Sequence, residues 1–184
     1  EFRRVLFRSS AQEAYEMIQE AFEYSEKYGT PVFLRPTTRV CHGYASIMVK
    51  DETEYTHHQP EGFIKDSKRW VIFPRLSFMN HKKIEARNQE LSDIFSSYEK
   101  NTIHPSCDAF KDSKKGIATG GISYTYTMET LKKTGMVKTL KIATPHPFPE
   151  KLAVDFLSGL DEVLCLEELD PVIERELIYI CGKY

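Results

Sequence analysis

Short apolar runs alternate with helical patterns in the C-terminal third of the chain. Three runs, at residues 117–119, 137–142 and 163–166, are rich in branched or apolar side chains. Such runs are typical of strands buried on both faces of a parallel sheet. Between them, residues 124–133 and 150–160 place apolar side chains three and four positions apart, as amphipathic helices do. This order predicts a β-α-β-α-β layer with right-handed crossovers, followed by a further helix over residues 171–180.

A second helix-strand unit is predicted near the start of the chain. Ser10 and Glu13 have the spacing of a capping box, and Gly29 can supply the left-handed residue that ends the helix. We expect one face of this helix to be buried, formed by Ala14, Ile18, Ala21, Phe22 and Ser25. The apolar run 32–34 then predicts a strand. One strand cannot satisfy its own backbone, so we interpret this unit as the end of a domain whose earlier strands are absent.

The first nine residues differ from the rest of the chain. Arginines are mixed with apolar residues there without helical amphipathicity, and residues 5–9 can be translated from the end of a common sequencing adapter. We therefore interpret residues 1–9 as a non-native assembly artefact and exclude them from the fold prediction.

The middle of the chain is predicted to connect the two units. Residues 50–67 are polar and lack periodicity, which indicates a linker. The apolar segment 69–74 contains Trp70, the only tryptophan, and we expect it to dock on a surface. A helix over residues 81–100 comes next, and residues 101–114 are expected to form a loop. The buried stripe of that helix is predicted to be Ile84, Leu91, Ile94, Phe95 and Tyr98.

Composition narrows the class of protein. The 184 residues carry a formal net charge of -2 and no basic stripe, which argues against a nucleic-acid partner. No apolar run approaches the roughly 20 residues that span a bilayer, and no signal-peptide pattern is present. The sequence therefore predicts a cytoplasmic protein with no membrane partner.

The four cysteines do not form a metal-binding pattern. Cys41, Cys107, Cys165 and Cys181 are far apart, and no CxxC pair exists. We expect reduced thiols, with Cys165 as a core residue of its strand.

Three places at strand ends carry candidate chemistry. Gly120-Gly121-Ile122-Ser123 joins a predicted strand to a helix, where backbone amides could hold a phosphate or carboxylate. No P-loop lysine follows and the dinucleotide-binding spacing is absent, so we favour a tight turn with Ser123 capping the helix.

Arg39 and His42 follow the strand at 32–34, where open α/β sheets place their ligand crevices. Arg39 could pair with a carboxylate or phosphate and His42 could move a proton, but a structural role at a domain or subunit contact is favoured.

Glu167 and Glu168 end the last predicted strand of the layer. Alternation along the strand sends them to opposite faces, so we expect one to cap or pair and the other to be solvated, rather than an acid-base pair. Asp170-Pro171 is expected to cap the next helix. His57-His58 lack a third ligand at useful spacing, so we expect them to be solvated rather than bound to metal.

Five segments in order resemble the alpha subunit of indolepyruvate ferredoxin oxidoreductase, a thiamine-diphosphate-dependent 2-oxoacid oxidoreductase. They are Gln12-Glu13-Ala14 leading to Pro31-Val32-Phe33-Leu34-Arg35, then Thr37-Thr38-Arg39-Val40-Cys41-His42, Arg69-Trp70-Val71, Gly116-Ile117-Ala118-Thr119-Gly120-Gly121-Ile122-Ser123-Tyr124, and Val163-Leu164-Cys165-Leu166-Glu167-Glu168-Leu169-Asp170-Pro171. The resemblance covers essentially residues 10–184. Residues 44–59 depart from the family pattern.

The resemblance implies an internal fragment of that subunit. Residues 10–50 would be the C-terminal end of a pyrimidine-binding thiamine-diphosphate domain, 51–114 a linker with a helix, and 115–184 a transketolase C-terminal-like parallel-sheet domain. The full-length family oxidatively decarboxylates arylpyruvates to aryl-acyl-coenzyme A and passes electrons to ferredoxin. It uses thiamine diphosphate, magnesium and 4Fe-4S clusters, together with a beta subunit.

This piece is expected to be mainly structural, to bind none of those cofactors alone and to hold no catalytic, cofactor-binding or metal-binding residue. Arg39 and His42 would be interface or substrate-channel residues. Two alternatives remain open. One is a related pyruvate or branched-chain 2-oxoacid ferredoxin oxidoreductase subunit, and the other is a non-catalytic α/β interaction module.

Overall fold

Four strands form one sheet in the C-terminal half of the chain. The computed structural model describes residues 5–7, 10–55, 57 and 59–184, and its strand order in this sheet is β3-β5-β4-β6. These strands are β3 (Thr102–His104), β4 (Lys115–Gly120), β5 (Lys138–Ile142) and β6 (Glu162–Leu166). β4 pairs in parallel with both β5 and β6, so that Ala118 lies opposite Leu140 on one side and Cys165 on the other. The predicted α/β layer is therefore present.

The prediction of an all-parallel sheet and of a loop over residues 101–114 was wrong in one respect. β3 lies in that range and pairs antiparallel with β5, with Ile103 opposite Leu140. Its Thr-Ile-His sequence is too short to show a periodicity, and its strand conformation depends on the edge that β5 offers. The sheet is mixed, with three parallel strands and one antiparallel edge.

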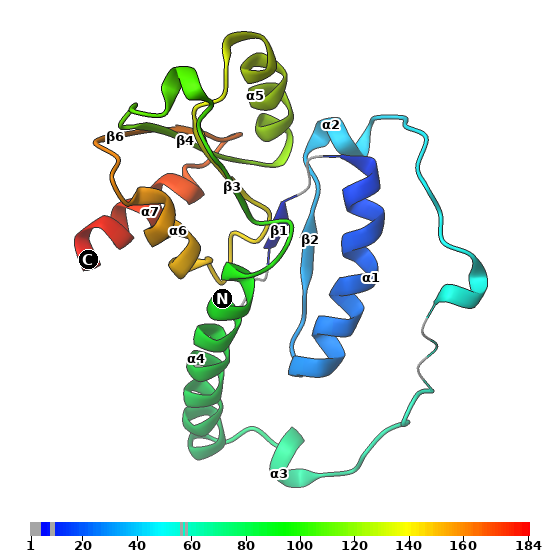
Figure 1. Ribbon diagram of the computed structural model, residues 1–184. Helices are drawn as coiled ribbons and strands as arrows, with labels where there is room; N and C mark the ends of the chain where they lie inside the picture. Colours follow the sequence, from blue (N-terminus) through cyan, green and yellow to red (C-terminus); the bar gives the residue numbers. More distant parts are fainter. Residues whose placement is uncertain (1–4, 8–9, 56, 58) are drawn as a thin grey trace.

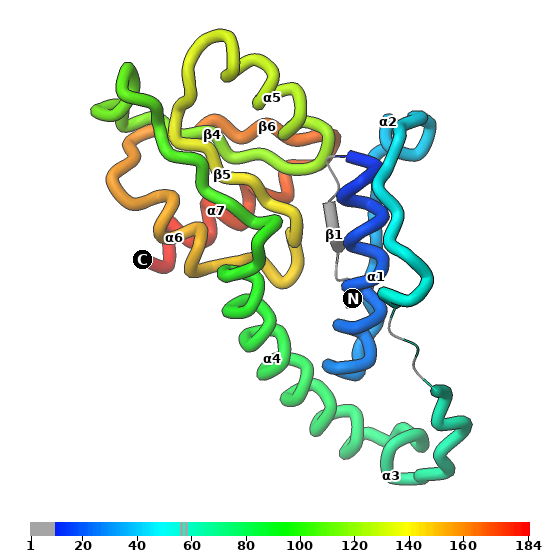
Figure 2. Tube along the Cα trace, turned by 45° about the vertical axis from the view of Figure 1, so that its right-hand side comes forward, coloured from blue at the N-terminus to red at the C-terminus, as the bar shows by residue number. Residues whose placement is uncertain are grey.

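Helices cover both faces of this sheet (Figure 1). They are α5 (Gly121–Thr134), α6 (Glu150–Leu157) and α7 (Val172–Lys183). α6 and α7 contact each other on one face, and α5 lies on the other (Figure 2). The main core fills the space between the sheet and the α6-α7 layer, where Leu140, Phe156 and Ile173 are fully buried. The β4-α5-β5-α6-β6-α7 order matches the doubly wound layer that the sequence predicts.

A smaller unit precedes the sheet domain. It contains β1 (Val5–Phe7), α1 (Ala11–Tyr28), β2 (Phe33–Arg35) and the short helix α2 (Thr38–Cys41). β1 lies within residues 1–9, which the fold prediction excluded, and it pairs in parallel with β2. Both predicted ends of α1 are confirmed, because the Glu13 N–H donates to Ser10 Oγ at 3.2 Å and Gly29 adopts φ 54°.

The predicted buried face of α1 is confirmed for Ala21 but wrong for Ile18 and Phe22. Ile18 is 39% exposed and Phe22 is 69% exposed, whereas Met17 and Ala21 are buried against Ala143 of the sheet domain. The spacing of apolar residues in α1 is compatible with burial of either the face with Ile18 and Phe22 or the adjacent face with Met17 and Ala21. The face that carries Glu13, Met17 and Ala21 is buried because it also supplies carboxylates for lysines of the sheet domain.

A long connection joins the two units. Residues 43–66 contain a short 3-10 helix, η1 (Glu52–Glu54), and are followed by α3 (Ser67–Trp70) and α4 (Pro74–Ser96). A second 3-10 helix, η2 (Asp108–Phe110), follows β3. α4 begins earlier than predicted because Pro74 occupies its first turn, where a missing N–H costs no hydrogen bond. Of its predicted stripe, Leu91 and Phe95 are buried.

The expected docking of Trp70 is also wrong. Its side chain is half exposed, donates from Nε1 to the Ile64 carbonyl at 2.7 Å and stacks on Phe63. These are local contacts within the connection. The apolar residues that follow, Val71, Ile72 and Phe73, are exposed as well. Among the residues described, no helix combines the length and apolarity that a bilayer crossing requires.

Candidate functional site

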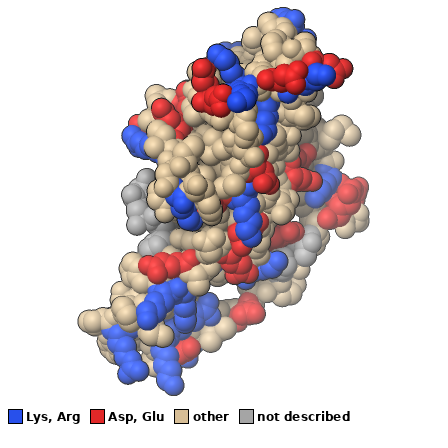
Figure 3. Space-filling view, turned by 60° about the vertical axis from the view of Figure 1, so that its left-hand side comes forward, with Lys and Arg blue, Asp and Glu red and all other residues tan. Residues whose placement is uncertain are grey.

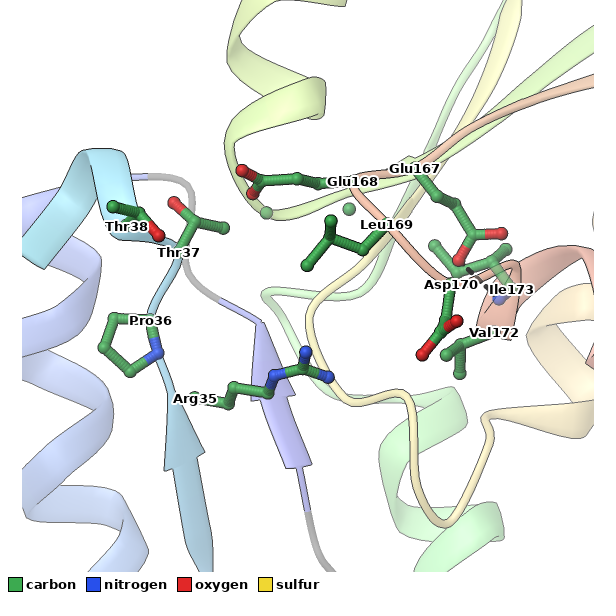
Figure 4. Close-up of a pocket in the computed structure, with 12 residues that line it drawn as sticks. Arg35, Pro36, Thr37, Thr38, Glu167, Glu168, Leu169, Asp170, Val172 and Ile173 are labelled. Carbon is green, nitrogen blue, oxygen red and sulfur yellow. Dashed lines mark hydrogen bonds between the residues drawn. The ribbon is translucent and has the colours of Figure 1, made fainter.

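A crevice lies where the smaller unit meets the sheet domain, at the carboxyl ends of β4 and β6 (Figure 4). The chain leaves β4 into α5 on one face of the sheet and leaves β6 toward α7 on the other. Adjacent parallel strands whose connections diverge in this way form a topological switch point, the usual ligand position of open α/β sheets. The cavity measures about 180 Å³. Its lining is Arg35, Pro36, Thr37, Thr38, Gly120, Gly121, Glu167, Glu168, Leu169, Asp170, Val172 and Ile173.

The Gly120-Gly121 turn forms one wall of the crevice. Gly121 adopts φ 58°, which a residue with a Cβ adopts at a steric cost, and α5 starts there. The prediction of a tight turn is confirmed, but that of a Ser123 cap is wrong, because no side chain caps α5. Gly120 itself occupies the N-cap position, which places Ser123 inside the helix, where its carbonyl accepts from Thr127 Oγ1.

Glu167 and Glu168 behave as the alternation predicts. Glu167 accepts from the N–H groups of Ile173 at 2.6 Å and Glu174 at 3.0 Å, so its carboxylate caps α7. Glu168 is exposed. The predicted Asp170 cap is wrong, since Pro171 is the N-cap residue and no side chain next to it caps the helix. Glu167 reaches the same N–H groups from six residues upstream, and negative charge there also complements the helix dipole.

The opposite wall comes from the end of β2. Figure 4 shows the Arg35 side chain extending from the strand into the space that faces the loop 167–170. Arg35 forms no ion pair with a carboxylate in the described part of the chain, and Thr37 Oγ1 is buried there without a hydrogen-bond partner. Sequence reasoning missed Arg35 as a site residue. The available signal was a charged side chain at the last position of a strand, next to the predicted crevice.

Arg39 and His42 do not line this crevice. Both lie on or just after α2, and both are exposed. Their expected role at an interface or substrate channel stays a prediction. The structure thus brings together three of the predicted segments, at 37–38, 120–121 and 167–168, and leaves the two named candidate side chains outside.

The crevice holds no complete catalytic arrangement among the described residues. Glu167 is engaged as a helix cap, and no cysteine or histidine lines the wall. No group of three or more potential metal ligands occurs in the part of the chain that is described. All four cysteines are free thiols, and burial raises the pKa of Cys165 to about 11. His57 is exposed, while His58 lies outside the described residues.

Buried lysines fasten α1 to the sheet domain. Lys141 of β5 pairs with Glu13, and both side chains are nearly inaccessible to water. Lys100 donates to Glu20 at 3.0 Å and lies 3.4 Å from Glu16. Three glutamates of α1 therefore pair with two lysines, one in β5 and one just before β3.

A histidine-tyrosine pair lies beside these ion pairs. The Tyr124 hydroxyl is 3.0 Å from His104 Nε2, and Lys141 Nζ lies over the Tyr124 ring. Burial, and then the charge of Lys141, lowers the pKa of His104, while burial raises the pKa of Tyr124. Both groups are therefore neutral near pH 7, which fits a structural role.

Comparison with known proteins gives a consistent relationship. The chain is 36% identical over 177 residues to indolepyruvate oxidoreductase subunit IorA of Methanothermobacter thermautotrophicus, which covers 95% of this chain and 28% of that protein. It is 36% identical over 178 residues to the subunit of the same name from Pyrococcus abyssi, with 94% and 27% covered. The Archaeoglobus fulgidus subunit is 30% identical over 169 residues, with 90% and 26% covered. No family model matches the chain. The chain thus spans about 28% of the length of the first of these relatives.

Proposed function

Because the chain belongs to the family of the indolepyruvate oxidoreductase subunit IorA, we propose that it works as a structural segment of such an alpha subunit. The observation that carries this proposal is similarity along 95% of this chain to one continuous part of a longer protein. The complete enzyme would oxidatively decarboxylate arylpyruvates to aryl-acyl-coenzyme A and pass the electrons to ferredoxin. It would work with a beta subunit.

Within that subunit, residues 115–184 would form a transketolase C-terminal-like domain. The three parallel strands with helices on both faces support this assignment. Residues 10–50 would end a pyrimidine-binding thiamine-diphosphate domain, and residues 51–114 would link the two. The helix α1 followed by the strand β2 supports the first part, because one short strand is not stable alone and needs native strands beside it. Residues 1–9 would be non-native.

The family's cofactors do not fit the residues described. Glu168 and Asp170 line the crevice and would repel the diphosphate of thiamine diphosphate, and Arg35 is the one cation among the lining residues that could offset them. A volume of about 180 Å³ is also small beside the roughly 300–1,000 Å³ of typical ligand sites. No group of three or more potential metal ligands, as a 4Fe-4S cluster requires, occurs in the described part of the chain. In this proposal these groups are held by other parts of the assembled enzyme, and no reaction step passes through this segment.

A segment exchange tests the proposal. The matched part of the M. thermautotrophicus subunit is replaced by residues 10–184 of this chain, and the chimera is co-expressed with its partner subunit. Indolepyruvate-dependent reduction of a viologen dye is then measured beside the unaltered enzyme. We expect an assembled enzyme that retains activity and the host's preference among 2-oxoacids. An assembled chimera that is inactive, or that prefers a different 2-oxoacid, would show that this segment does more than hold the structure.

The isolated chain provides the second measurement. Titration calorimetry with thiamine diphosphate and magnesium should give no heat of binding at micromolar concentrations. Binding at that level would place the cofactor on this segment and contradict the proposal.

A further inference from the structure

The strand β6 lies at one edge of the four-stranded sheet, although its side chains are those of an interior strand. It pairs with β4 on one side, and no described strand pairs with its other side. Val163 and Cys165 face the core between the sheet and the α6-α7 layer. Leu164 and Leu166 lie on the opposite face, where Leu164 is 57% exposed. A strand that is apolar on both faces is typical of the middle of a parallel sheet.

The free edge of β6 lacks the features that usually protect an edge strand. Short length, lysine, proline and bulges prevent the unpaired backbone groups of an edge from binding another strand. The opposite edge of the sheet is protected by its length, because β3 has three residues. β6 has five residues, pairs with β4 without a bulge and contains neither lysine nor proline. Lysine and arginine side chains gather instead at the protruding end that carries α3 and the first half of α4 (Figure 3). The β6 edge is therefore suited to receive a further strand.

A groove runs beside β6 on the face of the sheet that carries α5. It measures about 430 Å³, and its walls include Ile117 of β4, Tyr126 and Leu131 of α5, and Leu164 and Leu166 of β6. Tyr126 is 50% exposed, about as much as Leu164. α5 thus covers the sheet over β4 and leaves the outer part of this face, over β6, open. Side chains of a strand added at the edge would fill this groove.

The positions of the helices indicate where a next parallel strand lies. α5 leads from β4 to β5 on one face of the sheet, whereas α6 leads from β5 past β4 to β6 on the other face (Figure 2). The two crossovers run in opposite directions because crossovers between parallel strands are right-handed in nearly all proteins. α7 leaves β6 on the same face as α6. A parallel strand that follows α7 therefore lies beyond β6, at its free edge.

We propose that a further strand of the longer subunit, following α7 and parallel to β6, pairs with the free edge of β6. The inference rests on the proposed function, because this chain spans about 28% of the first relative and the rest of the subunit supplies the strand. The added strand lies about 4.8 Å from β6 and hydrogen-bonds to its free row of backbone groups. Its side chains on the α5 face cover Leu164 and Tyr126. Its carboxyl end lies beside the loop 167–170, so the chain that leaves it adds a third wall to the crevice.

Hydrogen-deuterium exchange followed by mass spectrometry tests the backbone pairing. Residues 162–166 are followed in the isolated 184-residue chain and in the chimera that carries residues 10–184 within the M. thermautotrophicus subunit. We expect the slowest amides of this segment to exchange at least about tenfold more slowly in the chimera, because free N–H groups of β6 become hydrogen-bonded. Residues 138–142 are the internal control. β5 is paired on both sides already, so its amides should exchange at the same rate in both proteins.

Leu164→Lys tests the side-chain packing under the added strand. Because Leu164 is exposed in the isolated chain, the variant should keep the urea midpoint of the unaltered chain. In the chimera the same lysine would enter an apolar groove closed by the added strand, so the melting temperature should fall by at least about 3 °C. Ile178→Lys is the matched control. Ile178 is 64% exposed on α7, on the other face of the sheet, and its substitution should leave both proteins unchanged.

Equal exchange of residues 162–166 in the isolated chain and in the assembled chimera would overturn the proposal. Slow exchange in the isolated chain that becomes fast on dilution would overturn it too, because a second copy would then occupy the edge. An assembled but inactive chimera contradicts the proposed function alone and leaves this measurement valid. If the chimera does not assemble, protection factors are measured on the segment of the unaltered M. thermautotrophicus subunit that aligns with residues 162–166. Absence of tenfold protection there, relative to the isolated chain, refutes the added strand.

Discussion

Replacing Lys100 with methionine tests how α1 is held to the sheet domain. The Lys100 side chain is 10% exposed, and its Nζ lies 3.0 Å from Glu20, 3.4 Å from Glu16 and 3.1 Å from Glu99. Burial alone lowers the pKa of Lys100, but hydrogen bonds to Glu20 and Glu99 outweigh it, and the pKa is raised above its ordinary value. Methionine is one heavy atom shorter than lysine and keeps most of the apolar stem while removing the charge. The substitution therefore isolates the ion pairs.

The expected loss can be worked from these contacts. Breaking a fully buried ion pair costs about 3–5 kcal/mol, and a charge-assisted hydrogen bond contributes about 1.5–3 kcal/mol. Glu20 is 29% exposed and Glu16 is 40% exposed, so water offsets part of the loss. We expect the free energy of unfolding to fall by about 2 kcal/mol, which corresponds to a melting temperature lower by about 4–8 °C for a chain of this size.

Lys151→Met is the matched control. Lys151 lies 3.0 Å from Asp93, but the two side chains are 69% and 43% exposed. Exposed pairs contribute roughly 0–1 kcal/mol. Urea unfolding of both variants, followed by circular dichroism, gives the comparison. Equal losses for the two substitutions would refute the argument that burial makes the Lys100 cluster important.

The difference in unfolding free energy between the unaltered chain and Lys100→Met should depend on pH, because the pKa values of Glu16 and Lys100 are shifted. A hydrogen bond from Gln12, and then Lys100, lowers the pKa of Glu16 below its ordinary value of 4.5. A carboxyl group with a lowered pKa stabilises the fold above its unfolded-state pKa, and that contribution is lost as the pH falls through the folded-state pKa. The raised pKa of Lys100 has its effect at alkaline pH, where the contribution is lost above 10.5. The stability difference between the unaltered chain and Lys100→Met should therefore be constant between about pH 6 and 9 and shrink below about pH 4.5.

Three further predictions concern the sheet domain. Glu167→Ala should lower the free energy of unfolding by about 1 kcal/mol through loss of the α7 cap, while Glu168→Ala should leave it unchanged; equal effects in urea unfolding would contradict the assignment. Gly116→Ala should lower the free energy of unfolding by about 1–3 kcal/mol, because the new alanine Cβ would lie 2.6 Å from Leu160 Cδ1. An unchanged urea midpoint would contradict this, because it would mean that the neighbouring side chains move aside without cost. Cys165 should react with iodoacetamide at about pH 8 far more slowly than the two exposed cysteines, because burial raises its pKa to about 11, and mass mapping that finds equal rates would refute this.

Most segments that line the crevice could be predicted from the sequence, but their meeting could not. The glycine turn, the pair of glutamates and the segment after β2 were each recognisable as strand ends, and strand ends of parallel sheets meet at one edge. Their convergence on one cavity could not be predicted, because residues 37–38 and 167–168 meet only through the packing of α1 on the sheet domain. Arg35 was missed for the same reason.

Local sequence determined the elements of this protein. The Ser10 and Gly29 caps, the three parallel strands and the helices between them follow from hydrogen-bond geometry and residue spacing within a few positions. The family relationship was also readable from the sequence, because it rests on segments in order.

Tertiary structure decided which surfaces those elements present. Met17 rather than Ile18 is buried on α1, and the short β3 pairs with the free edge of β5. Glu167 rather than Asp170 caps α7. For α1 and β3 a contact with a distant segment decided the outcome, whereas the α7 cap comes from a residue six positions before Ile173. Periodicity fixes the conformation of a segment, whereas the free energy of burial and charge pairing depends on what lies opposite.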